Sequence, residues 1–182
     1  DETVGSATDG GGTDAHPFVA TFENCTFTGN TTSSAYGKGG AVYVARFYKA
    51  NFNNCTFTAN QTTTSSATSY GGAIMVGACR DNESSPVMRG NVHALNLNNC
   101  HFENNLVNKT TFTGAVPGGC AVAVYQPENY EVNVNIDGGV FKNHTAPYVE
   151  GVVLYGASGT LSVKNATFSN NTNEGTLSAK AT

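Results

Sequence analysis

The five cysteines are the most reactive side chains of this 182-residue chain. Cys25, Cys55 and Cys100 hold the same slot in a segment that recurs along the sequence. Neighbouring β-strands lie about 4.8 Å apart, so the shared slot predicts either a column of buried thiols or a disulfide between neighbouring copies. The sequence has no Cys-x-x-Cys pair and no Cys/His spacing typical of zinc ligands. We therefore expect no metal ion and no cofactor.

Acidic residues are too few and too scattered to predict an active site. Enzymes that hydrolyse polysaccharides need two carboxylates held a few ångströms apart, on either side of the scissile bond. This chain has 13 Asp and Glu in total, and no Asp-Asp pair lies beside a predicted strand. The four histidines are far apart in the sequence. We expect no catalytic residues and predict that the chain is not an enzyme.

Asparagines followed by X-Ser/Thr are potential acceptors of N-linked glycans in secreted proteins. Nine such sequons occur in the chain. We expect glycans first in predicted loops, then at the start of predicted strands, and then at two further sites, in the order Asn82, Asn108, Asn24, Asn54, Asn165, Asn143 and Asn170. Asn30 and Asn60 are doubtful acceptors because their slot in the repeat can face inward. This density of sequons predicts an extracellular or cell-surface location.

The cysteines and several sequons belong to one recurring segment, whose copies begin at residues 22, 52, 97, 136 and 163. Irregular spacing of a constant segment indicates stacked structural units joined by loops of different length. Equivalent side chains then lie above one another. The expected core ladder is Phe27, Phe57, Phe102, Phe141 and Phe168. Three residues after each Phe comes Asn, or once His144, at an expected corner of the chain, where Asn tolerates a left-handed backbone and can bond its neighbour in the next unit.

Each unit also contains a strand after a glycine pair, as in residues 39–44 and 71–76, and an alternating apolar and polar strand, as in residues 132–136. We therefore predict an all-β fold, a parallel β-helix (β-solenoid) of about five coils with three strands each. Variable loops are expected at residues 31–38, 61–70, 80–90 and 106–117. An antiparallel sandwich is the main alternative, but it gives no reason for the segment to recur.

The chain is expected to form a single β-solenoid domain over residues 1–182. Residues 1–19 would be a leader or a first coil, residues 20–171 the repeated coils, and residues 172–182 a terminal strand. The net charge of −4 argues against nucleic acid and anionic membranes as partners. No apolar run approaches the roughly 18 residues that membrane insertion requires.

The alternation of two short motifs resembles the polymorphic outer membrane proteins of chlamydiae and repeats in surface proteins of some unicellular eukaryotes. Gly-Gly-Ala-Val/Ile stands at residues 39–42 and 71–74, and Phe-x-x-Asn recurs at residues 27–30, 57–60, 102–105 and 168–171. The resemblance covers roughly residues 20–171. It implies an adhesive, right-handed β-helix displayed outside the cell.

These observations lead us to expect an extracellular, N-glycosylated structural protein that forms part of a surface filament or coat. Its partner would be itself, in a head-to-tail homopolymer. The alternative is an adhesin that binds a cell-surface ligand through its lateral loops. A third reading, a polysaccharide-active enzyme on the same fold, is disfavoured by the scattered carboxylates.

Overall fold

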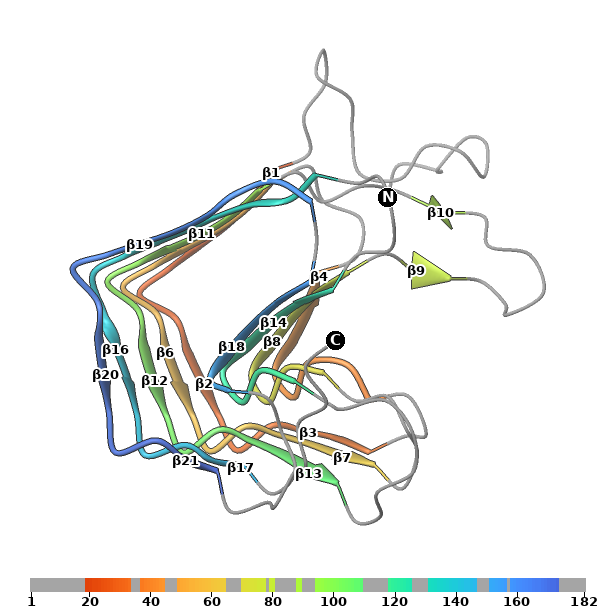
Figure 1. Ribbon diagram of the computed structural model, residues 1–182, viewed down its shortest axis with the longest axis vertical. Coiled ribbons are helices and arrows are strands. Elements are labelled where there is room, and N and C mark those ends of the chain that lie inside the picture. Colours follow the sequence, from red (N-terminus) through yellow and green to blue (C-terminus); the bar gives the residue numbers. More distant parts are fainter. Residues whose placement is uncertain are drawn as a thin grey trace, which may run out of the picture.

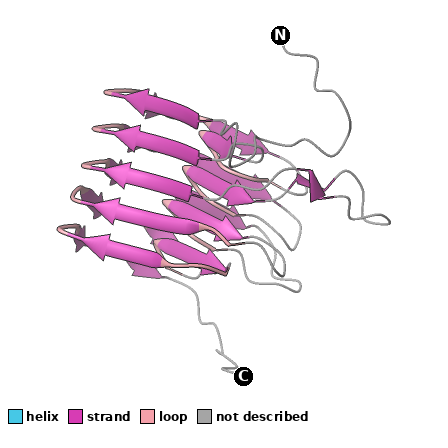
Figure 2. Ribbon diagram, turned by 90° about the horizontal axis from the view of Figure 1, so that it is seen from above, coloured by secondary structure: helices cyan, strands magenta, loops and turns pink. Residues whose placement is uncertain are grey.

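Short parallel strands stacked in register make up the computed structural model of this chain (Figures 1 and 2). The structure describes residues 19–33, 37–44, 49–64, 70–77, 79–80, 88–89, 94–109, 118–125, 131–146, 151–156 and 158–173. The predicted right-handed parallel β-helix is confirmed. Of the predicted segments 1–19 and 172–182, only Val19 and residues 172–173 lie within the described part.

Two five-stranded sheets form adjoining walls of the stack. The first sheet contains β1 (Val19–Glu23), β5 (Lys49–Asn53), β11 (Ala94–Asn98), β15 (Asn133–Asp137) and β19 (Leu161–Lys164). The second sheet contains β2 (Thr26–Thr28), β6 (Thr56–Thr58), β12 (His101–Glu103), β16 (Val140–Lys142) and β20 (Thr167–Ser169).

The remaining parallel strands form the other walls. The third sheet contains β3 (Thr31–Ser33), β7 (Gln61–Thr64) and β13 (Leu106–Lys109), and β17 (Thr145–Ala146) pairs separately with β21 (Thr172–Asn173). The fourth sheet contains β4 (Val42–Val44), β8 (Ile74–Gly77), β14 (Val122–Tyr125) and β18 (Val153–Gly156). An antiparallel pair, β9 (Cys79–Arg80) and β10 (Met88–Arg89), is inserted between the second and third coils.

The first four coils therefore carry four strands each rather than the expected three, because the recurring segment is not a single strand. It bends at Asn24, Asn54, Asn99 and Asn165, which have positive φ between 50° and 54°. Asparagine adopts this left-handed conformation more readily than most residues. We call this bend, between the first and second sheets, the first corner. It divides each copy between two walls.

Part of the region predicted to be loops is also strand. β3, β7 and β13 occupy the first residues of three expected loops, because polar residues there find partners inside the stack. Thr62 is fully buried and its hydroxyl donates to the Gly71 carbonyl at 2.8 Å. A threonine whose hydroxyl is hydrogen-bonded can occupy a buried position of a strand, as an apolar residue does.

The glycine pair before β8 shows why side chains are excluded at this turn. Gly71 has a φ of +70°, which L-residues rarely adopt. A Cβ on Gly72 would lie 2.1 Å from the Cys120 carbonyl oxygen in the next coil. The first glycine permits the turn, and the second permits close stacking of the coils.

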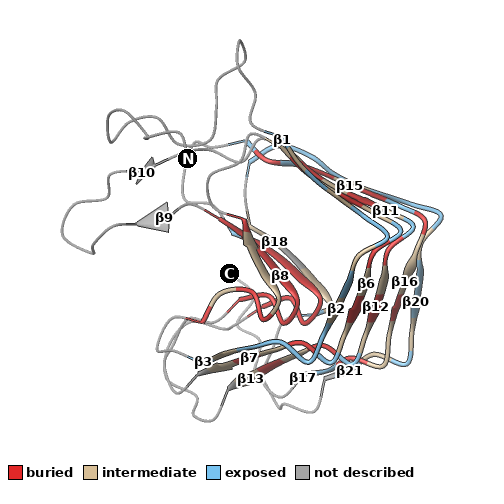
Figure 3. Cartoon of the chain, turned by 180° about the vertical axis from the view of Figure 1, so that it is seen from behind, coloured by how far each residue is buried: buried red, intermediate tan, exposed pale blue. Residues whose placement is uncertain are grey.

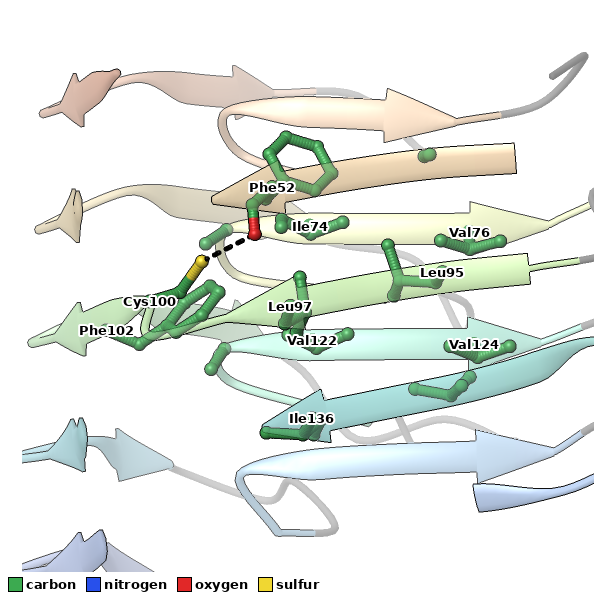
Figure 4. Close-up of a cluster of buried hydrophobic side chains, with 14 of the residues drawn as sticks. Phe52, Ile74, Val76, Leu95, Leu97, Cys100, Phe102, Val122, Val124 and Ile136 are labelled. Atoms are coloured by element: carbon green, nitrogen blue, oxygen red, sulfur yellow. Dashed lines mark hydrogen bonds between the residues drawn. The ribbon is translucent and has the colours of Figure 1, made fainter. Parts of the chain in front are cut away.

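The core fills the space enclosed by the sheets (Figure 4). Leu95 and Leu97 of β11 face Val122 and Val124 of β14 across it, and all four are fully buried. The described residues include no helix of the length and hydropathy needed to cross a membrane.

Candidate functional site: the two end coils

The column of cysteines lies at the first corner, and its thiols are free. Cys25, Cys55 and Cys100 are not joined to one another; the Cys100 thiol instead donates to the Phe52 carbonyl at 3.3 Å (Figure 4). Burial raises the pKa of Cys100 to about 11, and that of Cys120 likewise to about 11. These two thiols stay protonated at neutral pH and are poor nucleophiles.

A group of charged side chains lies on the outer face of the second sheet, around Glu103. Its carboxylate lies 3.1 Å from His101 Nε2 and 3.3 Å from Lys142 Nζ, and accepts a hydrogen bond from Asn143 Nδ2 at 3.0 Å. The hydrogen bond from His101 is the main cause that lowers the Glu103 pKa. A single carboxylate held by three donors is an ion-pair network, and it lacks the second carboxylate of a glycosidase pair. Within the described residues, no group of three His, Cys, Asp or Glu side chains could hold a metal ion.

The sequons fall into different environments. Asn24, Asn54 and Asn165 are exposed at the first corner, and Asn170 is exposed as well. Asn143 is half-buried, and Asn108 is half-buried within β13 rather than in the expected loop. Asn82 lies outside the described residues.

The doubtful sequon Asn60 is fully buried, as a member of what we call the asparagine ladder: Asn30, Asn60, Asn105, His144 and Asn171. The Asn60 backbone N–H and its Nδ2 both donate to Asn105 Oδ1 at 3.0 Å, and Nδ2 also donates to the Phe27 carbonyl at 2.9 Å. The ladder therefore bonds neighbouring coils as expected. The left-handed residue is the one before each ladder position, such as Ala59 or Asn104, and not the ladder asparagine itself.

His144 occupies one rung of this ladder and fits it less well. Its Nδ1 lies 3.1 Å from the Asn105 backbone nitrogen and 3.2 Å from the Asn105 carbonyl oxygen, and the tautomer of the ring decides which of the two it bonds. Nε2 is buried and has no hydrogen-bond partner within the described structure. Burial is the main cause that lowers the His144 pKa below 6.5.

The five rings of the phenylalanine ladder stack in one column, with neighbouring centroids 4.6–4.8 Å apart. Burial differs sharply along this column. Phe57, Phe102 and Phe141 are fully buried, whereas Phe168 in the last coil is 46% exposed. Figure 3 shows the same change, from buried residues inside the stack to exposed residues along β20.

The last coil also exposes the apolar side of β19. Leu161 and Val163 are 41% and 46% exposed, although their counterparts Val134 and Ile136 in the preceding coil are buried. At the opposite end, Phe22 and Phe27 of the first coil are only partly buried. We call the first coil (β1–β4) and the last coil (β19–β21) the end coils.

The end coils carry two charged residues, Glu23 and Lys164, that were not among the predicted site residues. The outward-facing ends of the first-sheet strands form a column of Glu23, Asn53, Asn98, Asp137 and Lys164. We call it the charge column. Its members occupy equivalent positions of aligned copies, so alignment of the repeats in the sequence could have revealed it.

This arrangement defines the class of protein: a β-solenoid with an apolar interior and polar outer walls. The family model described as "Right handed beta helix region" matches residues 10–182. The chain therefore belongs to the right-handed β-helix family. No curated protein and no solved structure gives a significant match.

Proposed function

We propose that this protein is an extracellular structural subunit that assembles end to end into a surface filament or coat. The observation that carries the proposal is the contrast within single columns: Phe141 is fully buried, and Phe168 in the next coil is 46% exposed. Apolar surface of this kind is favourable to cover, at roughly 25 cal/mol per Å². Another coil would cover it in the way that each coil covers its neighbour.

The edges of the sheets support the same proposal. β1 and β19 are the outer strands of the first sheet, and β2 and β20 are those of the second. An edge strand presents backbone N–H and C=O groups that can pair with a strand from another chain. A contact between unlike ends repeats without closing, and so builds a fibre.

The extracellular location rests on the sequons, of which Asn24, Asn54, Asn165 and Asn170 are exposed. Glycans at these positions would project from the outer walls and leave the ends of the stack free. We propose no catalytic role, because the Glu103 cluster is an ion-pair network with a single carboxylate.

The test is a concentration series of the purified chain, followed by light scattering and negative-stain microscopy. We expect particles that lengthen with concentration while keeping one width. Val163→Asp should prevent growth, because it places a charge in the apolar end face. Thr167→Asp is the matched control, since Thr167 faces outward in the same coil and is exposed. A wild-type chain that stays monomeric at high concentration would contradict the proposal.

An adhesin is the second candidate, favoured by the antiparallel pair β9–β10, which projects from the side of the stack (Figure 1). Replacing residues 78–90 with a short Gly/Ser linker would separate the two roles. Loss of binding to cells with unchanged assembly would support an adhesive role for this insertion.

A further inference from the structure

The strands of the first sheet keep one register from the first coil to the last. Glu23 pairs with Asn53, Asn53 with Asn98, Asn98 with Asp137, and Asp137 with Lys164. The charge column therefore begins with a carboxylate and ends with an ammonium group. Both end residues are exposed on the outer wall.

Resting on the proposed end-to-end assembly, we propose that a second copy of this chain stacks its first coil on the last coil in continuous register, with Lys164 paired to Glu23 of the next copy. Lys164 would then lie between two carboxylates, Asp137 of its own chain and Glu23 of the next. The contact is head to tail, and the partner is an identical chain.

The end coils have matching bends at two of their corners. The first corner has a φ of 54° at both Asn24 and Asn165, and the residue before the ladder is left-handed in both coils, at Gly29 (φ 66°) and Asn170 (φ 52°). A first coil therefore follows the last coil with the same bends that β19 and β20 make above β15 and β16. No change of backbone shape is needed at the corners.

The apolar columns also continue across this contact. In the continued register Val163 meets Phe22 of the next copy, and Phe168 meets Phe27. Inside the chain the equivalent pairs stack closely: Phe22 and Phe52 have centroids 4.8 Å apart at an interplanar angle of 6°. The exposed face of Phe168 would thus gain the neighbour that Phe141 has.

The asparagine ladder continues in the same direction. Within the chain a ladder N–H donates to Oδ1 of the asparagine in the following coil, as Asn30 N does to Asn60 Oδ1 and His144 N does to Asn171 Oδ1, both at 3.1 Å. In the proposed contact the Asn171 N–H donates to Asn30 Oδ1 of the next copy. The Asn30 Nδ2 of that copy donates to the Phe168 carbonyl, as Asn60 Nδ2 does to Phe27.

Charge favours this pairing over a tail-to-tail one. Head-to-tail stacking brings unlike charges together, whereas two last coils would bring two Lys164-bearing edges together. Two neighbouring outer columns end in uncharged residues, with Thr21 and Ser162 in one and Thr26 and Thr167 in the other. The charge column therefore sets the polarity of the contact.

The test uses two charge-reversed variants of the full chain, Glu23→Lys and Lys164→Glu, separately and mixed in equal amounts. Each variant alone places like charges at every junction, so the concentration needed for assembly should rise at least about fivefold. In the mixture both junctions pair unlike charges, and assembly should return to near the wild-type concentration. At 1 M salt, where the Debye length is about 3 Å, the differences should shrink.

Lys49→Glu is the matched control, because it makes the same change of charge on the outer wall of the second coil, away from both ends. It should assemble like the wild type. Circular dichroism of each variant in dilute solution checks that the fold is kept.

The outcomes separate the register from the proposed function. If wild type and both variants assemble alike, the register is wrong and end-to-end assembly stands. A wild type that stays monomeric overturns both. A closed dimer that does not grow identifies a tail-to-tail contact and also overturns the register.

Discussion

The middle coils and the end coils carry the same sequence motif in different physical conditions. Phe57 and Phe102 have a ring on each side and are fully buried, whereas Phe168 stacks on Phe141 alone and is 46% exposed. The motif specifies the shape of a coil, and the neighbouring coils provide much of its burial. A solenoid coil is therefore completed by what lies on both of its faces.

The largest contrast is expected in the phenylalanine ladder. Phe57→Ala should lower the free energy of unfolding by about 3–5 kcal/mol, because it opens a cavity in the middle of the stack. Phe168→Ala should cost only about 1–2 kcal/mol in the monomer, since half of the ring is already in water. Urea denaturation of dilute samples measures both. Equal losses would show that Phe168 is covered within the monomer.

The asparagine ladder should show the same contrast at a smaller scale. Asn105→Ala removes the acceptor of two Asn60 donors and the donor to the Phe57 carbonyl. The free energy of unfolding should therefore fall by about 2–4 kcal/mol. Asn30→Ala in the first coil should cost about 1 kcal/mol or less, because the Asn30 side chain is exposed and Asn60 Oδ1 keeps the hydrogen bond from the Asn30 backbone N–H. The same denaturation experiment compares them. A loss below about 1 kcal/mol for Asn105→Ala would mean that the buried ladder contributes little.

Replacing His144 with asparagine should increase the free energy of unfolding. His144→Asn restores the ladder and removes the unpaired buried Nε2, and we expect a gain of about 1–2 kcal/mol at pH 7.

The pH dependence of the free energy of unfolding measures the contribution of His144. Its folded pKa lies below 6.5, so the unfolded chain binds the proton more readily. Its contribution to stability is therefore complete above pH 6.5 and is lost as pH falls through the folded pKa. Glu103 and His101 are the charged groups that act on it. The acid loss should diminish in His144→Asn and persist in His101→Asn; an unchanged profile in His144→Asn would contradict this account.

The smallest effect on stability is expected where the outer wall meets solvent. Thr56→Ala removes the sequon at Asn54 without changing the left-handed asparagine, and should alter the stability of unglycosylated protein by less than about 0.5 kcal/mol. In protein secreted from eukaryotic cells, peptide mapping should find a glycan on exposed Asn54 and none on buried Asn60. A glycan on Asn60 in folded protein would contradict the ladder.

The sequence predicted the parts of this fold that repeat. The Phe and Asn slots, the glycine turns and the parallel stacking all follow from the alignment of copies, because equivalent residues in stacked coils become neighbours. The first corner is not predicted, because the sequence suggests a single strand for the recurring segment, and only the positive φ of Asn24 shows the bend. The strand at Asn108 was missed because its polar surroundings suggested a loop.

The candidate site was harder to predict than the fold. Alignment of the copies puts Glu23 and Lys164 at equivalent positions, but the structure is needed to show that both are exposed on the outer wall of the two end coils. The exposure of Val163 and Phe168 likewise depends on whether another coil packs against the last one. Their local sequence resembles that of the buried copies and does not predict the difference.

Hydrogen exchange at two protein concentrations tests the central claim most directly. In dilute solution the backbone N–H groups of β1 and β19 should exchange faster than those of β11, which pairs with β5 and β15. At a concentration that supports assembly, β1 and β19 should become protected while β11 changes little. Protection of β1 and β19 that already equals that of β11 in dilute solution, and does not change with concentration, would contradict assembly through the end coils.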